Sequence, residues 1–330
     1  MKFNFKIDST SSQTKLQQLI HAINEAISNG LFNVGDFLPS VNQLSRQSGL
    51  SRDTIFKAYS ILKQRSIISS TPTKGYFVSS LSFKVMVLLD DFSAFKEQLY
   101  TSFRNNLPEN YTVDLLFHHY NPDVFDQLIL NSLGRYSMYV VMNFNNQRIE
   151  NVVRKIDPNK LLILDMGTPD NPDIAYLTQD FTFGVLDCLK EALPLIRKYS
   201  EFHLVFPEVL FHPKEFIHSF TYFCNSSKLT YSLIRKVADH QVQAGQAFLV
   251  IREDDLVNII RQCREKGLEP GKDVGLISYN DTPMKEIVGN GITTISVNFA
   301  EMGLKAARFV ETKEKIFEML TPKLTVRGSL

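Results

Sequence analysis

Residues 51–54 bring together side chains that can read the edges of DNA bases. The guanidinium of Arg52 can donate two hydrogen bonds to O6 and N7 of guanine, and the carboxylate of Asp53 can accept one from the amine of cytosine. Ser51 and Thr54 flank them where the free backbone N–H groups of a helix start favour phosphate. The segment therefore indicates contact with duplex DNA. The alternative is a set of solvated charges that cap an ordinary helix.

Three further residues fit the same chemistry. Lys57 lies one helical turn beyond the segment, and Lys74 lies at the tip of a predicted hairpin, so both can reach phosphate. Gly75 lets the backbone of that hairpin approach the minor groove closely because it has no side chain. Together with residues 51–54, they predict a recognition helix, which enters the major groove, and a wing.

A small helical domain is needed to position these residues. Apolar residues recur at helical spacing over 15–29, and Ser40 can cap a second helix with Gln43 completing a capping box. A third helix begins after Ser51, and two strand-length runs around a Pro and Gly turn predict a hairpin over 67–78. This order of elements is that of a winged helix-turn-helix.

Beyond a Ser-rich joint, strand-length apolar runs alternate with helix-length segments, which predicts doubly wound parallel sheets. About 245 residues is large for one such sheet, so we expect two lobes. The predicted strands are Val85–Leu89, Val113–Phe117, Tyr139–Met142, Leu161–Leu164, His203–Phe206, Thr230–Ile234, Ala247–Ile251, Val274–Ser278 and Thr293–Val297.

Composition limits the class of protein. The chain has 330 residues, of which 44% are hydrophobic, and no apolar run approaches the roughly 20 residues that cross a bilayer. The amino terminus lacks a signal-peptide core, and three widely spaced Cys suit a reduced compartment, so we expect a cytoplasmic protein with no disulfide framework. Residues 1–80 carry a net charge of +5 and the remainder −4, as expected if a phosphate-binding module is joined to another domain.

Cofactor and catalytic motifs are absent from the sequence. The histidines lack metal-ligand spacing, so we expect no metal site. Neither G-x-x-x-x-G-K-[ST] nor G-x-G-x-x-G occurs, and there is no G-x-S-x-G elbow. Asp90 and Asp91 are adjacent, and neighbouring side chains normally point apart, so an acid pair is the less favoured interpretation. We expect no cofactor and no enzymatic activity.

The amino-terminal residues 12–79 contain three motifs in order: Leu38-Pro39-Ser40, Gly49-Leu50-Ser51-Arg52-Asp53-Thr54 and Gly75-Tyr76-Phe77-Val78. In their order and spacing they resemble the winged-helix domain of GntR-family bacterial transcription regulators. It implies that Ser40 and Asn42 also lie at the DNA. Many members have Arg at the position of Asn42, and Asn can instead read an adenine edge, so the resemblance does not define the operator sequence.

The rest of the chain carries a second set of motifs, which include Gln179-Asp180-Phe181, Asp273-Val274-Gly275-Leu276-Ile277-Ser278-Tyr279-Asn280-Asp281-Thr282-Pro283 and the final Val326-Arg327-Gly328-Ser329. With these motifs it resembles the LacI/GalR-type effector domain, which is related to periplasmic binding proteins of bacterial transport. The resemblance implies a two-lobed domain that binds a small ligand, usually a sugar, in the cleft between its lobes. By family analogy we expect the chain to cross between lobes near residues 200, 296 and 321.

The residues that carry over to the cleft suit a polyol, because carboxylates and amides bond vicinal hydroxyls and aromatic rings stack on a sugar face. They are Asp90, Phe92, Asp165, Asp180, Phe181, Arg252, Glu253 and Asn280. The family usually has Asn-Asp at 252–253 and often Asp at 280, so its hexose assignments do not transfer. The run Glu253-Asp254-Asp255 can also be explained as a helix start whose charges suit the helix dipole.

The sequence thus predicts a DNA-binding transcription regulator with a winged helix at 1–79, a linker at 80–83 and an effector domain at 84–330. We expect a homodimer, because one winged helix contacts too few bases. The expected ligand is a monosaccharide, and a phosphosugar is the alternative. Two other classes stay open: an enzyme acting on a sugar or phosphosugar with an interaction module at its amino terminus, and a transport binding protein, which the basic amino-terminal domain disfavours.

Overall fold

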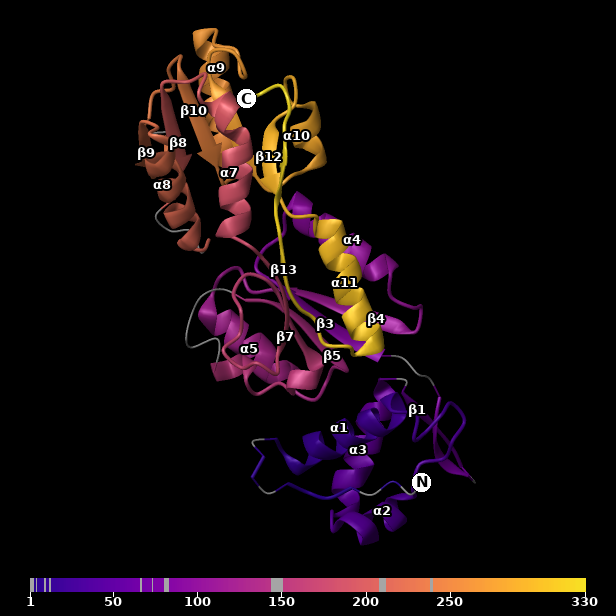
Figure 1. The fold of residues 1–330 in the computed structure, drawn as a ribbon. Helices are drawn as coiled ribbons and strands as arrows, with labels where there is room; N and C mark the ends of the chain where they lie inside the picture. Colours follow the sequence, from indigo (N-terminus) through magenta and orange to yellow (C-terminus); the bar gives the residue numbers. More distant parts are fainter. Residues whose placement is uncertain are drawn as a thin grey trace.

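The structure is a computed structural model of residues 1–330. It describes all of them except residues 1, 2, 4, 9, 12, 66, 73, 80–82, 144–150, 208–211 and 238–239. Three bodies follow one another: an amino-terminal head and two sheet lobes (Figure 1). The predicted linker falls mostly on residues outside the described set.

The head contains the predicted helices and hairpin. Its elements are α1 (Lys15–Ser28), α2 (Val41–Ser48), α3 (Arg52–Gln64), β1 (Ile68–Thr71) and β2 (Gly75–Val78). Leu19, Ile23 and Tyr59 are fully buried in its core, and β1 pairs antiparallel with β2. The head is therefore a winged helix-turn-helix with an apolar core of its own.

Capping differs in one detail from the prediction. The Ser40 hydroxyl accepts a hydrogen bond from the backbone N–H of Gln43, but the reciprocal capping box forms at the start of α1, between Thr14 and Gln17. Either arrangement satisfies backbone N–H groups that the first helical turn leaves without partners.

The first lobe is an all-parallel six-stranded sheet in the order β13-β7-β6-β5-β3-β4. The strands are β3 (Phe83–Leu89), β4 (Tyr111–Phe117), β5 (Met138–Met142), β6 (Leu161–Asp165), β7 (Ala175–Gln179) and β13 (Phe317–Leu320). The helices include α4 (Ala94–Asn105), α5 (Pro122–Ser132) and α11 (Phe299–Thr312), with the short η1 (Pro158–Lys160) before β6. Helices α4 and α11 pack closely because Gly303 lets their backbones approach each other.

The second lobe repeats the plan with strand order β14-β12-β11-β10-β8-β9. Its strands are β8 (Glu201–Val205), β9 (Tyr231–Ile234), β10 (Gln246–Val250), β11 (Gly275–Tyr279), β12 (Thr293–Ser296) and β14 (Lys323–Thr325). Its helices include α7 (Phe183–Ile196), α8 (Glu215–Ser227), α9 (Glu253–Lys266) and α10 (Pro283–Ile287). Only the edge strand β14 is antiparallel among these described strands. The predicted fold class is confirmed.

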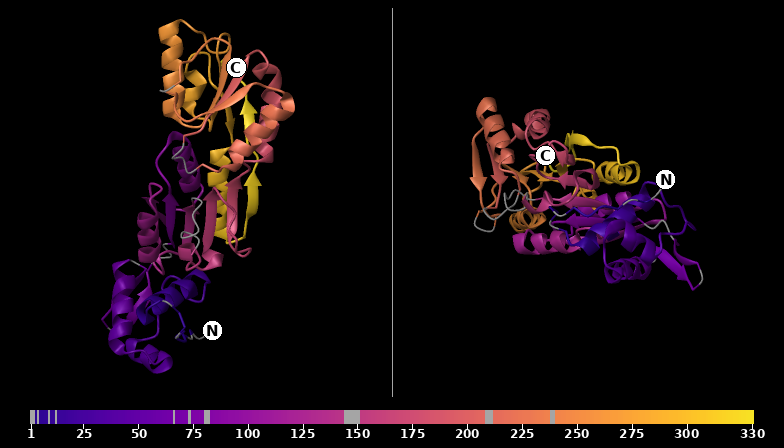
Figure 2. Two further views of the ribbon diagram at one scale, coloured as in Figure 1. Left: turned by 90° about the vertical axis from the view of Figure 1, so that its left-hand side faces the viewer. Right: turned by 90° about the horizontal axis from the view of Figure 1, so that it is seen from below.

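The expected chain crossing near residue 200 is wrong. Helix α7 packs into the core of the second lobe, where Val185 and Leu189 are fully buried beside Phe202, so the chain crosses at 180–182 instead. Gly184 allows this crossing, because a Cβ there would lie 2.5 Å from Pro322, in the connection between β13 and β14 that crosses in the same direction later in the chain. Figure 2 shows this late segment, in yellow, passing from the first lobe to the second.

Candidate DNA-reading face and interlobe cavity

The first turn of α3 is exposed at the head. The Ser51 hydroxyl accepts from the Thr54 backbone N–H at 3.1 Å and hydrogen-bonds the Thr54 hydroxyl at 2.8 Å, so both side chains take part in the cap. The side chain of Arg52 at the first helical position is exposed. Asp53 and Lys57 form an exposed ion pair of 2.8 Å, which competes with the base and phosphate roles expected of them.

The other predicted DNA residues lie on α2 and the wing. Ser40 caps α2, Asn42 is exposed on its first turn, and Lys74 and Gly75 are exposed at the hairpin. Gly75 has a φ of +92°, a conformation that favours glycine at this turn. Helix α2 lies at the end of the head away from the lobes (Figure 1), so docking of the head leaves it accessible.

The opposite side of the head docks on the first lobe through an ionic cluster. Lys160 Nζ lies 3.0 Å from Glu25 Oε1 and 2.9 Å from His21 Nε2, and Lys313 donates to Asn29 at 3.5 Å. The hydrogen bond to His21 and the charge of Lys160 lower the pKa of Glu25 to about 2. Sequence reasoning missed this contact, because its partners lie 139 positions apart and nothing local pairs them.

Charge reversal tests this docking contact. We expect Glu25→Lys or Lys160→Glu alone to broaden the distance distribution between spin labels at Gln43→Cys and Glu109→Cys, and the double exchange to narrow it again. A partly buried pair of this kind is worth about 1 kcal/mol, enough to shift a docking equilibrium severalfold. Double electron–electron resonance measures the distribution.

The matched control exchanges the exposed pair Asp187 and Lys190, which lies in the second lobe and should leave the distribution unchanged. Single reversals without effect, or a double exchange that fails to restore the narrow distribution, would show that the cluster does not hold the head.

A cavity of about 560 Å³ opens between the two lobes, at the carboxyl ends of their parallel strands. Seven of the eight predicted ligand residues line it: Asp90, Phe92, Asp165, Phe181, Arg252, Glu253 and Asn280. The eighth, Asp180, is not brought to this cavity. Its carboxylate accepts from the N–H groups of Thr182 and Gly184, each at 2.9 Å, and so caps α7 beside a neighbouring pocket.

Acidic groups on the first-lobe side are held in fixed positions. Buried Lys96 forms ion pairs with Asp90 and Asp91, and the Tyr120 hydroxyl donates to Asp90 at 2.5 Å. Lys96 and Tyr120 were not predicted, because a lysine five residues after a carboxylate is a common surface pattern. The pairing occupies the Lys96 ammonium and leaves this side of the cavity rich in hydrogen-bond acceptors.

Asp165 is the most perturbed of the predicted residues. Burial, with the nearby charge of Asp90 second, raises its pKa to about 6. Its carboxylate accepts from Gln179 Nε2 at 2.5 Å, and Gln179 Oε1 accepts from the Tyr279 hydroxyl at 2.8 Å. Asp165 also has a φ of +71°, so the backbone is strained where β6 ends.

Three buried polar atoms of cavity-lining residues have no hydrogen-bond partner among the described residues: Ser93 Oγ, His212 Nε2 and Asn280 Oδ1. Burial lowers the pKa of His212 to about 3, so its ring is neutral. Buried polar groups are normally paired, and a ligand with several hydroxyls can satisfy all three. Phe181 is largely buried against His212 and Tyr279, with ring centroids 5.0 and 6.1 Å away, so it supports the cavity wall as well as facing it.

On the second-lobe side, the run Glu253-Asp254-Asp255 forms the first turn of α9, as the dipole explanation predicts. Glu253 and Asp254 line the cavity all the same, and Arg252 Nη2 bonds Asp254 at 2.9 Å. Asp255 is buried instead, beside the backbone N–H of Val237. The first turn of α9 therefore contributes both charge to the helix start and polar groups to the cavity.

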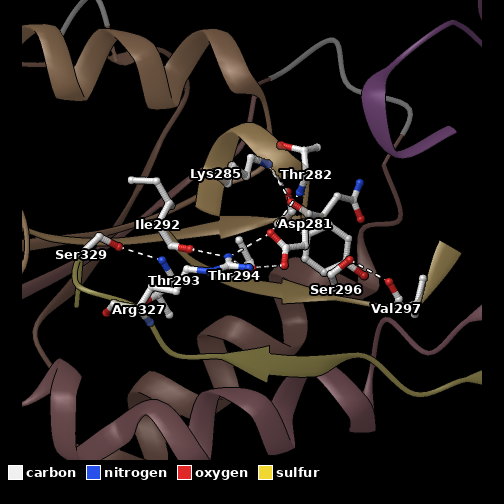
Figure 3. A network of polar contacts seen from close by, with 12 residues as sticks. Asp281, Thr282, Lys285, Ile292, Thr293, Thr294, Ser296, Val297, Arg327 and Ser329 are labelled. Carbon is white, nitrogen blue, oxygen red and sulfur yellow. Dashed lines mark hydrogen bonds and ion pairs between the residues drawn. The ribbon is translucent and has the colours of Figure 1, made fainter. Parts of the chain in front are cut away.

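A polar network anchors the loop that carries Asn280 (Figure 3). Arg327 donates to both carboxylate oxygens of Asp281, at 2.9 and 2.7 Å, and to the Ile292 carbonyl at 2.8 Å. Lys285 donates to the carbonyls of Tyr279 and Asn280 at 3.1 and 2.6 Å, and burial lowers its pKa to about 8. The loop at the end of β11 is thus tied to the carboxyl-terminal segment.

Removing this anchor should destabilise the second lobe. Arg327→Met is expected to lower the free energy of unfolding by about 2 kcal/mol, since it leaves the mostly buried Asp281 carboxylate without its charged donors. Urea denaturation measures the loss. Arg308→Met removes an exposed pair with Glu314 and should change stability by less than about 0.5 kcal/mol. Equal losses in the two variants would contradict a structural role for Arg327.

Comparison with protein families finds a match in each half of the chain. Residues 15–78 match the model described as bacterial regulatory proteins, gntR family, and residues 216–330 match a periplasmic binding protein-like domain. None of the described helices combines the length and apolarity needed to cross a bilayer.

Among curated proteins, the HTH-type transcriptional repressor YtrA of Bacillus subtilis is 31% identical over 94 residues, which cover 28% of this chain and 72% of the repressor. The uncharacterized HTH-type transcriptional regulator YjiR of Escherichia coli is 39% identical over 66 residues, or 20% of this chain. The match spans only 14% of YjiR, so the chain shares one domain with that regulator.

Solved structures match about three quarters of the chain. The trehalose repressor from Escherichia coli has a TM-score of 0.64 at 14% identity, and the match covers 74% of this chain and all of that structure. The lac repressor dimer bound to operator and an anti-inducer has a TM-score of 0.62 at 15% identity and covers 75% of this chain and 94% of its own. These proteins are regulators rather than enzymes. The chain therefore belongs to the GntR family of bacterial regulatory proteins and joins that family's helix-turn-helix domain to a two-lobed fold like that of LacI-type repressors.

Proposed function

We propose that this protein is a one-component transcription regulator whose affinity for its operator is set by a neutral monosaccharide bound between the lobes. The observation that carries the proposal is the interlobe cavity, which gathers seven predicted ligand residues and three buried polar atoms that lack a partner within the described part of the chain. The same chain has an exposed recognition helix, α3. The predicted boundaries, 1–79, 80–83 and 84–330, serve as the working division for truncations.

The charges of the cavity favour a neutral sugar over a phosphosugar. Its described lining includes five carboxylates, whereas the ammonium of Lys96 and the guanidinium of Arg252 already have acidic partners. A phosphate would lie among like charges and would need one of these pairs to open. Sucrose is bound in the structure of a LacI-family regulator from Lactobacillus casei that shares this fold, which supports a carbohydrate ligand.

The mechanism is linkage between ligand and DNA. The ligand contacts both lobes, and the head contacts the first lobe, so a ligand that prefers one relative position of the lobes changes the population of DNA-binding states. We propose a cytoplasmic homodimer, because two heads on a palindromic operator share the entropic cost of docking. The lac repressor dimer on its operator supports this arrangement.

An enzyme acting on a sugar or phosphosugar is the second class. The contacts of Asp90 disfavour it, because Lys96 forms an ion pair with this carboxylate and the Tyr120 hydroxyl donates to it, so Asp90 is not free to act as a base or a nucleophile beside Asp165. A turnover assay on any sugar that stabilises the fold separates the two classes: conversion of that sugar would favour the enzyme.

A thermal-shift screen of pentoses, hexoses and deoxyhexoses, each beside its phosphate ester, tests the proposal. A specific ligand at 100 times its dissociation constant adds about 2.7 kcal/mol of stability, which shifts the melting temperature by several degrees. We expect a neutral sugar to shift it and the matching phosphate ester to do little. A shift by the ester alone would favour the phosphosugar, and no shift by either set would contradict a carbohydrate effector.

A further inference from the structure

An aromatic side chain lies exposed on the outer face of α3, the recognition helix. Phe56 on α3 is 55% exposed, whereas Ile55, Ala58 and Tyr59 on the inner face are fully buried. None of the aromatic ring pairs found among the described residues includes Phe56. The head core therefore gains little from this side chain.

The position of Phe56 relates it directly to the base-reading turn. It follows Arg52 by four residues, so the two side chains lie on one row of the helix, about 6 Å apart along its axis. Base pairs are stacked about 3.4 Å apart, so a helix placed along the major groove sets Phe56 about two base pairs from the base that Arg52 contacts.

The chemistry around Phe56 selects what it can contact. The outer face of α3 carries the cations Arg52, Lys57 and Lys63 and one carboxylate, Asp53, which pairs with Lys57. The face therefore has a net positive charge that attracts phosphate. The edges of the bases in the major groove are polar except for one group, the C5-methyl of thymine. A phenyl ring in contact with that methyl group removes apolar surface of both groups from water. The ring offers no hydrogen bond to the other bases.

We propose that Phe56 specifies thymine in the operator, through apolar contact with its C5-methyl group about two base pairs from the base read by Arg52. The inference rests on the proposed DNA-binding function and adds a specificity residue to it. It also predicts a feature of the operator that the family resemblance leaves open.

Selection of binding sites from random duplex DNA tests this proposal, because the selection itself yields the operator motif. We expect the full-length wild-type protein to select a motif with thymine at one position in each half-site, and Phe56→Ala to lose that preference while it keeps the remaining positions. Phe56→Leu keeps an apolar side chain and should retain part of the preference.

Replacing that thymine by deoxyuridine in the selected duplex removes only the methyl group. Binding of the wild type should weaken by about fourfold for each half-site, the value of one buried methyl-sized group, whereas binding of Phe56→Ala should not change. Deoxyuridine at a thymine outside the motif is the matched DNA control. Lys57→Ala is the protein control, and it should lower affinity for both duplexes equally.

The outcomes separate this inference from the function it rests on. Suppose that the wild type selects a motif, that deoxyuridine does not change its affinity, and that Phe56→Ala selects the same bases. The thymine assignment is then wrong and DNA binding stands. If Phe56→Ala instead abolishes dimerisation in sedimentation velocity, the ring belongs to a contact between heads and the thymine assignment is again wrong. If the wild type selects no motif, both proposals fail.

Discussion

Arg52→Ala is expected to weaken binding to the selected operator by about 5- to 150-fold and to change binding to random-sequence DNA far less. The range corresponds to the roughly 1–3 kcal/mol of discrimination that one bidentate contact to guanine provides. The exposed position of Arg52 at the start of α3 supports this role, and Ser51 and Thr54 hold the turn beneath it. Fluorescence anisotropy on the two kinds of duplex at one salt concentration measures both affinities.

A cation that only neutralises phosphate gives a different result. Lys57→Ala should lower operator and random-sequence affinity by the same factor and reduce the salt dependence of both. If Arg52→Ala behaves like this control, Arg52 takes no part in base readout, and the first turn of α3 must contact bases through other side chains.

Asp165→Asn is expected to make the protein more stable at neutral pH and less able to bind its effector. The pKa of Asp165 is raised to about 6 from an ordinary value of 3.8. The folded protein therefore holds more protons than the unfolded chain between these values, and its stability falls as pH rises from about 4 to about 6. Above pH 6 the ionised carboxylate costs the fold roughly 2–3 kcal/mol. Asn removes that cost, and Asn also tolerates the positive φ.

Urea denaturation at pH 4.5 and pH 7.5 measures this effect. The free energy of unfolding of Asp165→Asn should exceed that of the wild type at pH 7.5 and approach it at pH 4.5, while Asp187→Asn, on an exposed carboxylate, should match the wild type at both. Effector affinity should fall by about tenfold or more, because a charged acceptor is lost. A variant that is less stable at pH 7.5 would show that the ionised carboxylate is compensated in the fold.

Local patterns predicted most of the fold. Each buried strand with a continuous apolar run was found in the sequence, for example Val85–Leu89 inside β3. The strands β7, β13 and β14 were missed, because Thr178, Gln179 and Glu318 interrupt their apolar character and two of the three lie at sheet edges. Edge strands bury less apolar surface than central strands, so their sequences show a weaker apolar pattern.

The functional sites, like the fold, could be predicted where the signal is local in the sequence, and were missed where the contact depends on distant residues. The cavity residues could be predicted because the family motifs place them near the ends of strands, as Asn280 follows β11, and Phe181 came from its motif alone because the strand before it, β7, was missed. Asp180 was misplaced because an acceptor just before a helix serves equally as a cap. His212 was missed because the fold brings it to the cavity from a segment with no motif, and the contact of Lys160 with the head depends on the packing of separate bodies.

The most direct test measures affinity for the selected operator with and without the sugar that gives the largest thermal shift, with Arg52→Ala and Asp165→Asn beside the wild type. We predict that saturating sugar changes wild-type affinity by at least about fivefold, within the usual range of allosteric coupling, and that a much higher sugar concentration is needed for Asp165→Asn. An operator affinity that does not change when the cavity is filled would contradict control of DNA binding by the interlobe ligand.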